Sequence, residues 1–217
     1  MDKLTGQQIA DEALDEWAYL LGGLQTRIRT PDFAAGLALA NAIGAAAEEM
    51  NHHPDLYLRF RHLDIRLTSS DAHGVTDRDI QLARTISSIA ADAGLPGERA
   101  SVSRLELALD SPAYATVLPF WNAVLATEHL SGPAFGDELR DPFGTLPAVW
   151  FQKSGSEEPR QRWHPDVWVD PAQVQPRMAA ALAAGGTLVS DEEAPSFWVL
   201  ADPEGNRVCL CTWQERN

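Results

Sequence analysis

One pattern occurs twice in the second half of the chain and limits its possible folds more than any other sequence feature. An alternating strand that ends in aspartate, LELALDSP or HPDVWVDP, is followed each time by a helix-like run, AYATVLPFWNAVL or AQVQPRMAAALAAGG. The two aspartates, Asp110 and Asp170, occupy equivalent positions, and each copy later contains a further strand, at residues 148–153 and 207–212. We therefore predict an internal duplication of a βαβββ module with one helix and several strands.

The segment AGLPGERASVS, residues 93–103, separates this duplicated half from the rest of the chain. Gly94 stops the preceding helix, and the Leu-Pro-Gly run with small polar residues after it is typical of a linker. We predict two domains, at residues 1–97 and 98–217.

Composition and charge exclude several kinds of partner. The 217 residues include 45% hydrophobic and 22% charged residues, which is typical of a globular protein with a buried core. The formal net charge of −14 repels nucleic acid, because Lys and Arg provide most of the affinity for its phosphates. No apolar run approaches the ~20 residues that a membrane span needs, and the acidic N-terminus lacks the apolar region of a signal peptide. We expect no nucleic-acid partner and no membrane partner.

The two cysteines suggest a compartment. Cys209 and Cys211 lie on one face of a predicted strand, where they are badly placed for a mutual disulfide. Because free thiols persist in reducing compartments, we expect a cytoplasmic protein.

Two capping boxes mark helix starts in the first domain. Thr5 is followed three residues later by Gln8, and Thr76 is followed by Asp79 at the same spacing. The second of these helices is expected to end at Gly94.

A further helix is expected between Thr30 and Asn51. Thr30 is a suitable N-cap because proline follows it at the first helical position. Apolar and small residues then recur at spacings of three and four, starting with Phe33 and Leu37, and predict the buried face. The helix must end by Asn51, because the residue before Pro54 is forced out of the α region.

Alternating residues predict the strands of the first domain. Short strands are expected at about residues 17–21 and 24–30. Residues 56–68 also alternate, but the apolar parity switches at His62, and a slip of one residue turns side chains to the opposite face. We predict one strand with a bulge there. The whole chain is then an α+β protein, with helices on a small antiparallel sheet followed by the paired βαβββ modules.

The stretch AEEMNHHPDLYLRF contains the strongest candidates for chemistry. His52 and His53 stand at the expected helix end, and an imidazole can give or take a proton near neutral pH. Glu48 and Glu49 are close enough to orient a ring. From spacing alone, catalysis and a polar helix end whose side chains satisfy the last carbonyls are equally good interpretations. Zinc is disfavoured here, because its ligands are usually spaced by two to five residues and no cysteine is near.

The same stretch resembles the signature of the pterin-4a-carbinolamine dehydratases. That signature has an acid, three residues, His-His-Pro, an aromatic residue and, further on, a histidine and an aspartate. The matching residues are Glu48, His52, His53, Pro54, Phe60 and Asp79. The resemblance covers nearly all of residues 1–97. It implies that a reduced pterin carbinolamine, 4a-hydroxytetrahydrobiopterin, loses its C4a hydroxyl and becomes the quinonoid dihydropterin. The reaction needs an acid and a base but no metal or other cofactor.

Ser70 departs from this signature, because the family has its third histidine there. Loss of one proton-transfer group typically costs ~10²–10⁴-fold in rate. Three outcomes are open: an impaired dehydratase, a dehydratase rescued by His73 folding back from its loop, or a pocket kept for pterin binding or dimerisation without catalysis. We favour the dehydratase. The expected catalytic residues are His52, His53 and His73, and the expected substrate-binding residues are Glu48, Pro54, Ser69, Ser70 and Asp71. Self-association in the family implies a homo-oligomer.

The duplicated half resembles the glyoxalase-like branch of the vicinal-oxygen-chelate superfamily over roughly residues 102–213. Metal-using members take ligands from strands of both modules, and the matching candidates are Arg104 or Glu106, Gln152, His164 and Cys209. Because arginine cannot ligate and Cys209 mixes soft sulfur with hard oxygen donors, we expect no metal. Five aromatic residues either line an apolar ligand pocket or form ordinary core: Trp150, Trp163, Trp168, Phe197 and Trp198. The resemblance also leaves small-molecule binding by this half as an alternative principal function.

Overall fold

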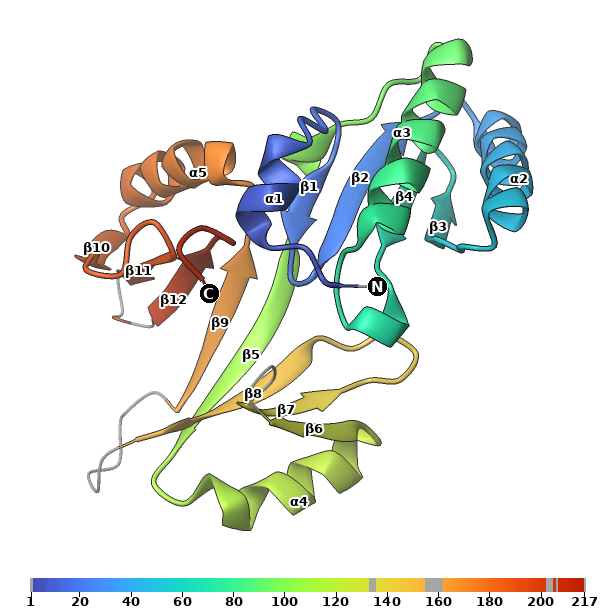
Figure 1. The fold of residues 1–217 in the computed structure, drawn as a ribbon. Helices are drawn as coiled ribbons and strands as arrows, with labels where there is room; N and C mark the ends of the chain where they lie inside the picture. The colour runs from blue at the N-terminus through green and yellow to red at the C-terminus, as the bar shows by residue number, and fades with distance from the viewer. Residues whose placement is uncertain (1, 133–135, 155–161, 202–204, 206, 217) are drawn as a thin grey trace. The chain divides into compact units, whose positions relative to one another are not determined.

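The computed structural model describes residues 2–132, 136–154, 162–201, 205 and 207–216, which form two compact units (Figure 1). The first unit is Met1–Ser103 with Val169–Gln173 and Thr212–Asn217, and the second is Arg104–Trp168 with Val174–Cys211. This division does not establish which segments fold independently, so the domain limits 1–97 and 98–217 stay predictions. None of the described helices combines the length and the apolar composition that crossing a membrane requires.

A four-stranded antiparallel sheet forms the centre of the first unit. Its strands are β1 (Ala18–Leu20), β2 (Gly23–Arg29), β3 (Asp55–Arg59) and β4 (His62–Leu67), in the order β1-β2-β4-β3. On β4, Leu63, Ile65 and Leu67 are buried, while the residues between them are half-buried. This alternation gives the sheet one core face.

The prediction of a single bulged strand over residues 56–68 is wrong. Strands β3 and β4 pair antiparallel, and Arg59 lies opposite His62 across a two-residue turn. Cross-strand partners of a hairpin point to the same face, so Leu58 and its partner Leu63 lie on one side of the sheet. A hairpin and a bulge therefore produce the same parity switch in the sequence.

The first unit also contains the α-helices α1 (Gly6–Asp11), α2 (Phe33–Met50) and α3 (Asp77–Asp92). Both predicted capping boxes are confirmed, at the starts of α1 and α3. The predicted N-cap Thr30 is wrong. Asp32 caps α2 instead, and its carboxylate accepts a hydrogen bond of 2.8 Å from the backbone N–H of Ala35. A carboxylate next to the orphan amides of the first turn is also favoured by the helix dipole.

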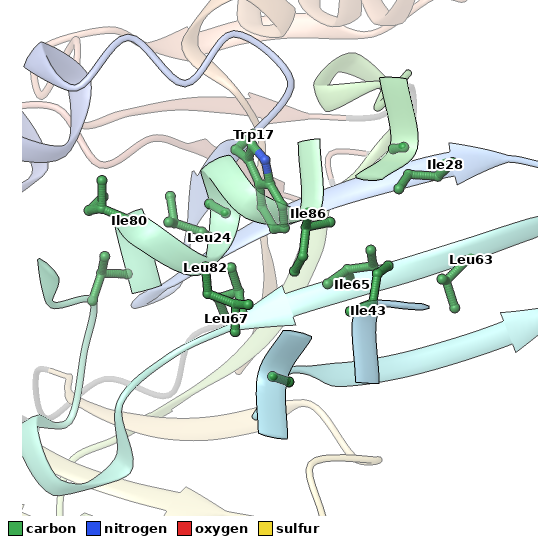
Figure 2. Close-up of a cluster of buried hydrophobic side chains, with 14 of the residues drawn as sticks. Trp17, Leu24, Ile28, Ile43, Leu63, Ile65, Leu67, Ile80, Leu82 and Ile86 are labelled. Atoms are coloured by element: carbon green, nitrogen blue, oxygen red, sulfur yellow. The ribbon is translucent and has the colours of Figure 1, made fainter. Parts of the chain in front are cut away.

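The hydrophobic core of the first unit gathers side chains from the helices and the sheet (Figure 2). Ile43 of α2 and Ile86 of α3 are fully buried and cluster with Leu63 of β4. The predicted buried face of α2 is wrong for Phe33 and Leu37, which are 48% and 46% exposed, whereas Ala47 near the end of the helix is buried. The helix FAAGLALANAIGAAAEEM has small residues on every side, so spacing alone does not identify the face that packs.

The second unit contains one eight-stranded sheet in the order β10-β11-β12-β9-β5-β8-β7-β6. The strands are β5 (Arg104–Ser111), β6 (Glu128–Gly132), β7 (Gly136–Arg140), β8 (Ala148–Lys153), β9 (Trp163–Trp168), β10 (Thr187–Ser190), β11 (Phe197–Ala201) and β12 (Arg207–Cys211). Helix α4 (Tyr114–Leu125) follows β5, and α5 (Pro171–Ala183) follows β9.

The predicted duplication is confirmed by the pairing of these strands. In each module the first strand pairs parallel with the last, β5 with β8 and β9 with β12. The two modules join where β5 and β9 pair antiparallel. The chain is therefore an α+β protein in which a helix-covered antiparallel sheet is followed by paired βαβββ modules.

Candidate functional site

A cavity of about 330 Å³ lies in the first unit, where the end of α2, the segment after β4 and the start of α3 come together. It is lined by Asn51, His52, His53, Thr68, Ser69, Ser70, Asp71 and Arg78. Five of the eight residues predicted for the site therefore line one cavity. Glu48, Pro54 and His73 are not among the lining residues.

The end of α2 sends the two histidines into different surroundings. Asn51 adopts the left-handed conformation, with a φ of 48°, and the backbone N–H of His52 then donates to the carbonyl of Ala47 at 3.1 Å. This turn leaves His52 only 8% exposed. The side chain of His53 is 55% exposed. One ring is thus fixed inside the protein and the other is reached by solvent.

The imidazole of His52 is held by a buried carboxylate. Its Nε2 lies 2.8 Å from Oδ1 of Asp79, which is fully buried. The other oxygen, Oδ2, accepts hydrogen bonds of 2.8 Å from the Ser69 hydroxyl and of 2.8 Å from the Thr76 backbone N–H. Because a carboxylate only accepts, Nε2 of His52 carries the shared proton and Nδ1 is left for another partner.

Asp79 has donors available because of its place in the sequence. It is the third residue of α3, and the capping box brings the Thr76 amide to its carboxylate. The positive end of the helix dipole also favours a negative charge at this position. The predicted capping box and the orientation of His52 therefore depend on the same side chain.

The outer histidine has a weaker partner. Nε2 of His53 lies 3.1 Å from Oε1 of Glu48, whose side chain is 78% exposed. Exposed pairs of this kind contribute little to stability, because water competes for both groups. Glu48 therefore contacts the predicted site through His53 and not through the cavity.

Another wall of the cavity is formed by the short 3₁₀ helix η1 (Ser70–Ala72) and the first turn of α3. The Asp71 carboxylate accepts a hydrogen bond of 2.5 Å from Nη2 of Arg78, and this guanidinium holds the pKa of Asp71 below its ordinary value. Ser70, at the position where the family has its third histidine, is exposed on this wall. His73 follows η1 in the left-handed conformation and is exposed.

Sequence reasoning missed Arg78. Its side chain lines the cavity and is 33% exposed, and its Nε is buried without a hydrogen-bond partner among the described residues. The signal in the sequence is its position immediately before Asp79, in the turn that follows the predicted substrate loop.

The second unit brings together only part of the metal-ligand set expected from resemblance, His164 with Cys209. Glu106 accepts a hydrogen bond of 2.7 Å from the Trp168 indole, and Gln152 is exposed near the end of β8. His164 and Cys209 instead meet Asp166, and one ligand atom from each of the three lies within 4.8 Å of the others. A nitrogen, a sulfur and a carboxylate oxygen form a donor set that fits a zinc-type cation.

The aromatic residues of the second unit are divided between core and polar contacts. Trp163 packs against the core cluster around Leu139 and meets Trp121 edge to face, with ring centroids 5.0 Å apart. The indoles of Trp150 and Trp168 donate hydrogen bonds to buried carboxylates, those of Asp166 and Glu106. The apolar ligand pocket stays a prediction.

Comparison with known proteins identifies both parts of the chain. Residues 2–89 match the family model for pterin 4 alpha carbinolamine dehydratase, and residues 106–211 match that for a glyoxalase-like domain. A protein of Burkholderia cenocepacia (strain HI2424), named "Putative pterin-4-alpha-carbinolamine dehydratase", is 39% identical over 95 residues, which are 42% of this chain and 93% of the relative. A protein of the same name from Halobacterium salinarum (strain R1) is 32% identical over 83 residues, 38% of this chain and 91% of the relative.

Solved structures match each half separately. A crystal structure of a transcriptional coactivator/pterin dehydratase from Brucella melitensis is 26% identical and has a TM-score of 0.40, with coverage of 41% of this chain and 99% of that one. A glyoxalase/bleomycin resistance protein/dioxygenase superfamily member from Vibrio splendidus 12B01 is 15% identical, with a TM-score of 0.36 and coverage of 51% and 99%. The chain belongs to the pterin-4a-carbinolamine dehydratase family through its first half and joins that family's domain to a glyoxalase-like domain.

Proposed function

We propose that the first domain is a hydro-lyase that dehydrates 4a-hydroxytetrahydrobiopterin to the quinonoid dihydropterin. The observation that supports this proposal most is the buried contact between His52 and Asp79 at the wall of a polar cavity. A carboxylate that fixes one nitrogen of an imidazole leaves the other nitrogen with a defined role in proton transfer.

The proposal assigns one proton transfer to each histidine. During dehydration the C4a–O bond breaks and N5 of the pterin loses its proton, while the electron pair of the N–H bond forms the new C4a=N5 double bond. His52 takes the N5 proton through Nδ1, because Nε2 is already engaged by Asp79. His53, at the solvent side, donates a proton to the departing hydroxyl, which leaves as water.

Three other residues of the cavity support the substrate and not the proton transfers. Ser70 offers a hydroxyl and Asp71 a carboxylate acceptor for the polar edge of the pterin, and Arg78 offers donors. Ser70 cannot exchange a proton at neutral pH as an imidazole does. We therefore propose a dehydratase that is slower than a family member with three histidines. Contribution by His73 and a homo-oligomeric state stay predictions.

The test is the rate of dehydration of synthetic 4a-hydroxytetrahydrobiopterin by the full chain and three variants. His53→Ala is expected to lower the rate by ~10²-fold. His52→Gln is expected to do the same, and its amide keeps a donor for Asp79, so the fold is preserved. The control is His62→Ala on β4, outside the cavity, which leaves the rate unchanged. Equal rates for His53→Ala and the full chain contradict the assignment.

A second candidate function is pterin binding without turnover. Ser70 favours it, because the position of the third histidine carries no proton-transfer group. Binding of a reduced pterin analogue, measured by calorimetry, with no dehydration above the rate in buffer supports this function. No binding at all contradicts both candidates.

A further inference from the structure

Three metal-ligating side chains gather on two neighbouring strands of the second unit. His164 and Asp166 are two residues apart on β9 and so point to the same face of the sheet. Cys209 is the register partner of Asp166 on the parallel strand β12. One ligand atom from each residue lies within 4.8 Å of the other two. The group therefore results from strand register and not from a flexible loop.

Asp166 provides an independent sign that a cation belongs there. The residue is 6% exposed, and its Oδ2 accepts a hydrogen bond of 3.1 Å from the Trp150 indole. Its Oδ1 is buried and has no hydrogen-bond partner among the described residues. Nε2 of His164 lies 3.6 Å from this oxygen, which is too long for a hydrogen bond. A buried carboxylate oxygen without a donor is costly unless a positive charge faces it.

The imidazole of His164 lies between two carboxylates. Nε2 faces Asp166, and Nδ1 lies 3.8 Å from Oδ2 of Asp110 at the end of β5. A histidine that ligates through one nitrogen commonly directs the other to a carboxylate, which fixes the ring. Asp110 is placed to be that carboxylate. Trp150 has the same relation to Asp166, because its indole holds the oxygen that does not face the histidine.

We propose that His164, Asp166 and Cys209 bind one zinc-type divalent cation in the second unit. Thiolate, imidazole and carboxylate are all zinc ligands, whereas magnesium and calcium require oxygen donors. Three protein ligands leave a fourth position open, as in zinc sites that bind water or a ligand. All three ligands come from the second module, so the site differs from the two-module set expected from resemblance. The proposal does not depend on the dehydratase function.

The first experiment measures metal in the full chain purified without chelators. Elemental analysis is expected to find about one zinc per chain. After removal by a chelator, calorimetric titration with Zn²⁺ is expected to restore one site, and Co²⁺ is expected to produce the thiolate-to-cobalt absorption of a Cys-ligated ion. Metal that is lost on simple dialysis, or a cobalt complex without this absorption, contradicts the proposal.

Variants identify the ligands. His164→Ala, Asp166→Asn and Cys209→Ser are each expected to weaken Zn²⁺ binding at least tenfold, as measured on metal-free protein. Cys211→Ser is the matched control, since it changes the same kind of residue two positions along β12 and is expected to bind as the full chain does. Circular dichroism of each variant without metal separates loss of a ligand from loss of the fold. Equal weakening by Cys211→Ser, or unchanged binding by Asp166→Asn, overturns the site.

Discussion

The two units each contain a buried aspartate beside a histidine, but the two carboxylates are surrounded differently. In the first unit both oxygens of Asp79 accept hydrogen bonds, from His52 on one side and from Ser69 and Thr76 on the other. In the second unit only one oxygen of Asp166 has a donor among the described residues. We therefore propose that the same pair of residue types serves proton transfer in one place and cation binding in the other.

Secondary structure explains this difference. Asp79 lies in the first turn of a helix, where backbone N–H groups have no partner in the helix and are available to a carboxylate. Asp166 lies within β9, between β5 and β12, where backbone groups pair with the neighbouring strands. Only side chains or a cation can then satisfy its carboxylate. The position of an acid within its element determines which chemistry it can support.

Removal of the Asp79 carboxylate, whose two oxygens both accept hydrogen bonds, should have the largest effect on stability. Asp79→Ala leaves His52, Ser69 and the Thr76 amide without their common acceptor, and loss of one partner from a buried pair costs about 3–5 kcal/mol. We expect the free energy of unfolding in urea to fall by about this amount. Asp77→Ala, at an exposed position of the same helical turn, should change it by only ~0.5 kcal/mol. Equal effects of the two substitutions would show that the buried network is not what stabilises the site.

Replacement of Ser70 by histidine should show that the first site is limited by proton transfer. Ser70→His returns an imidazole to an exposed position on the cavity wall. The expected result is a rise of ~10²-fold in the rate of carbinolamine dehydration. Chelator should leave this rate unchanged, because neither histidine of the proposed mechanism ligates a metal. Ser70→Ala serves as the control for changed size. A rate equal to that of the full chain would favour binding without turnover.

Unlike Asp79→Ala, the substitution Asp166→Asn should not lower the stability of the metal-free protein. In metal-free protein the substitution removes a buried charge whose Oδ1 has no donor, so the free energy of unfolding should stay within ~1 kcal/mol of the full chain or rise. With Zn²⁺ added, only the full chain should gain stability, because binding to the folded state alone is stabilising. Thermal unfolding with and without Zn²⁺ measures both effects. Strong destabilisation of the metal-free variant would mean that Asp166 is as well satisfied as Asp79.

Loss of the ion pair between Arg78 and Asp71 should have the smallest effect on stability. The Arg78 guanidinium lowers the pKa of Asp71, so the folded state favours the ionised carboxylate. The stabilisation is present above the ordinary pKa of an aspartate and is lost as the pH falls through the lowered value. Asp71→Asn should therefore be slightly less stable than the full chain at pH 7 and equal to it in strong acid. Urea unfolding at both values checks this, and a difference that persists in acid would assign the effect to packing.

Sequence patterns predicted the features that local chemistry determines. The capping boxes at Thr5 and Thr76, the end of α2 at Asn51 and the duplication of the second half depend on spacing along the chain, and all are confirmed. The N-cap of α2 was not predictable in this way, because Thr30 and Asp32 are both good N-cap residues and only the path of the chain selects one of them.

Features that depend on how segments pair and pack were not predictable. The β3–β4 hairpin was mistaken for a bulged strand, because both place the same apolar residues on one face. Arg78 enters the cavity only when α3 packs beside η1, and Asp166 joins Cys209 only through the register of β9 and β12. Resemblance directed attention to ligand positions in both modules, whereas the described contacts place the candidate ligands in one.

Asn51, in the left-handed conformation at the end of α2, places the side chains of His52 and His53 in different surroundings. Since Asn51 turns the backbone there, the inner ring is constrained by the protein interior, while the outer ring is reached by solvent and contacts the exposed Glu48. The outer position can therefore accept new side chains without repacking the molecule. This gives protein engineers a place to vary the acid strength of the proposed proton donor while the inner histidine keeps its position.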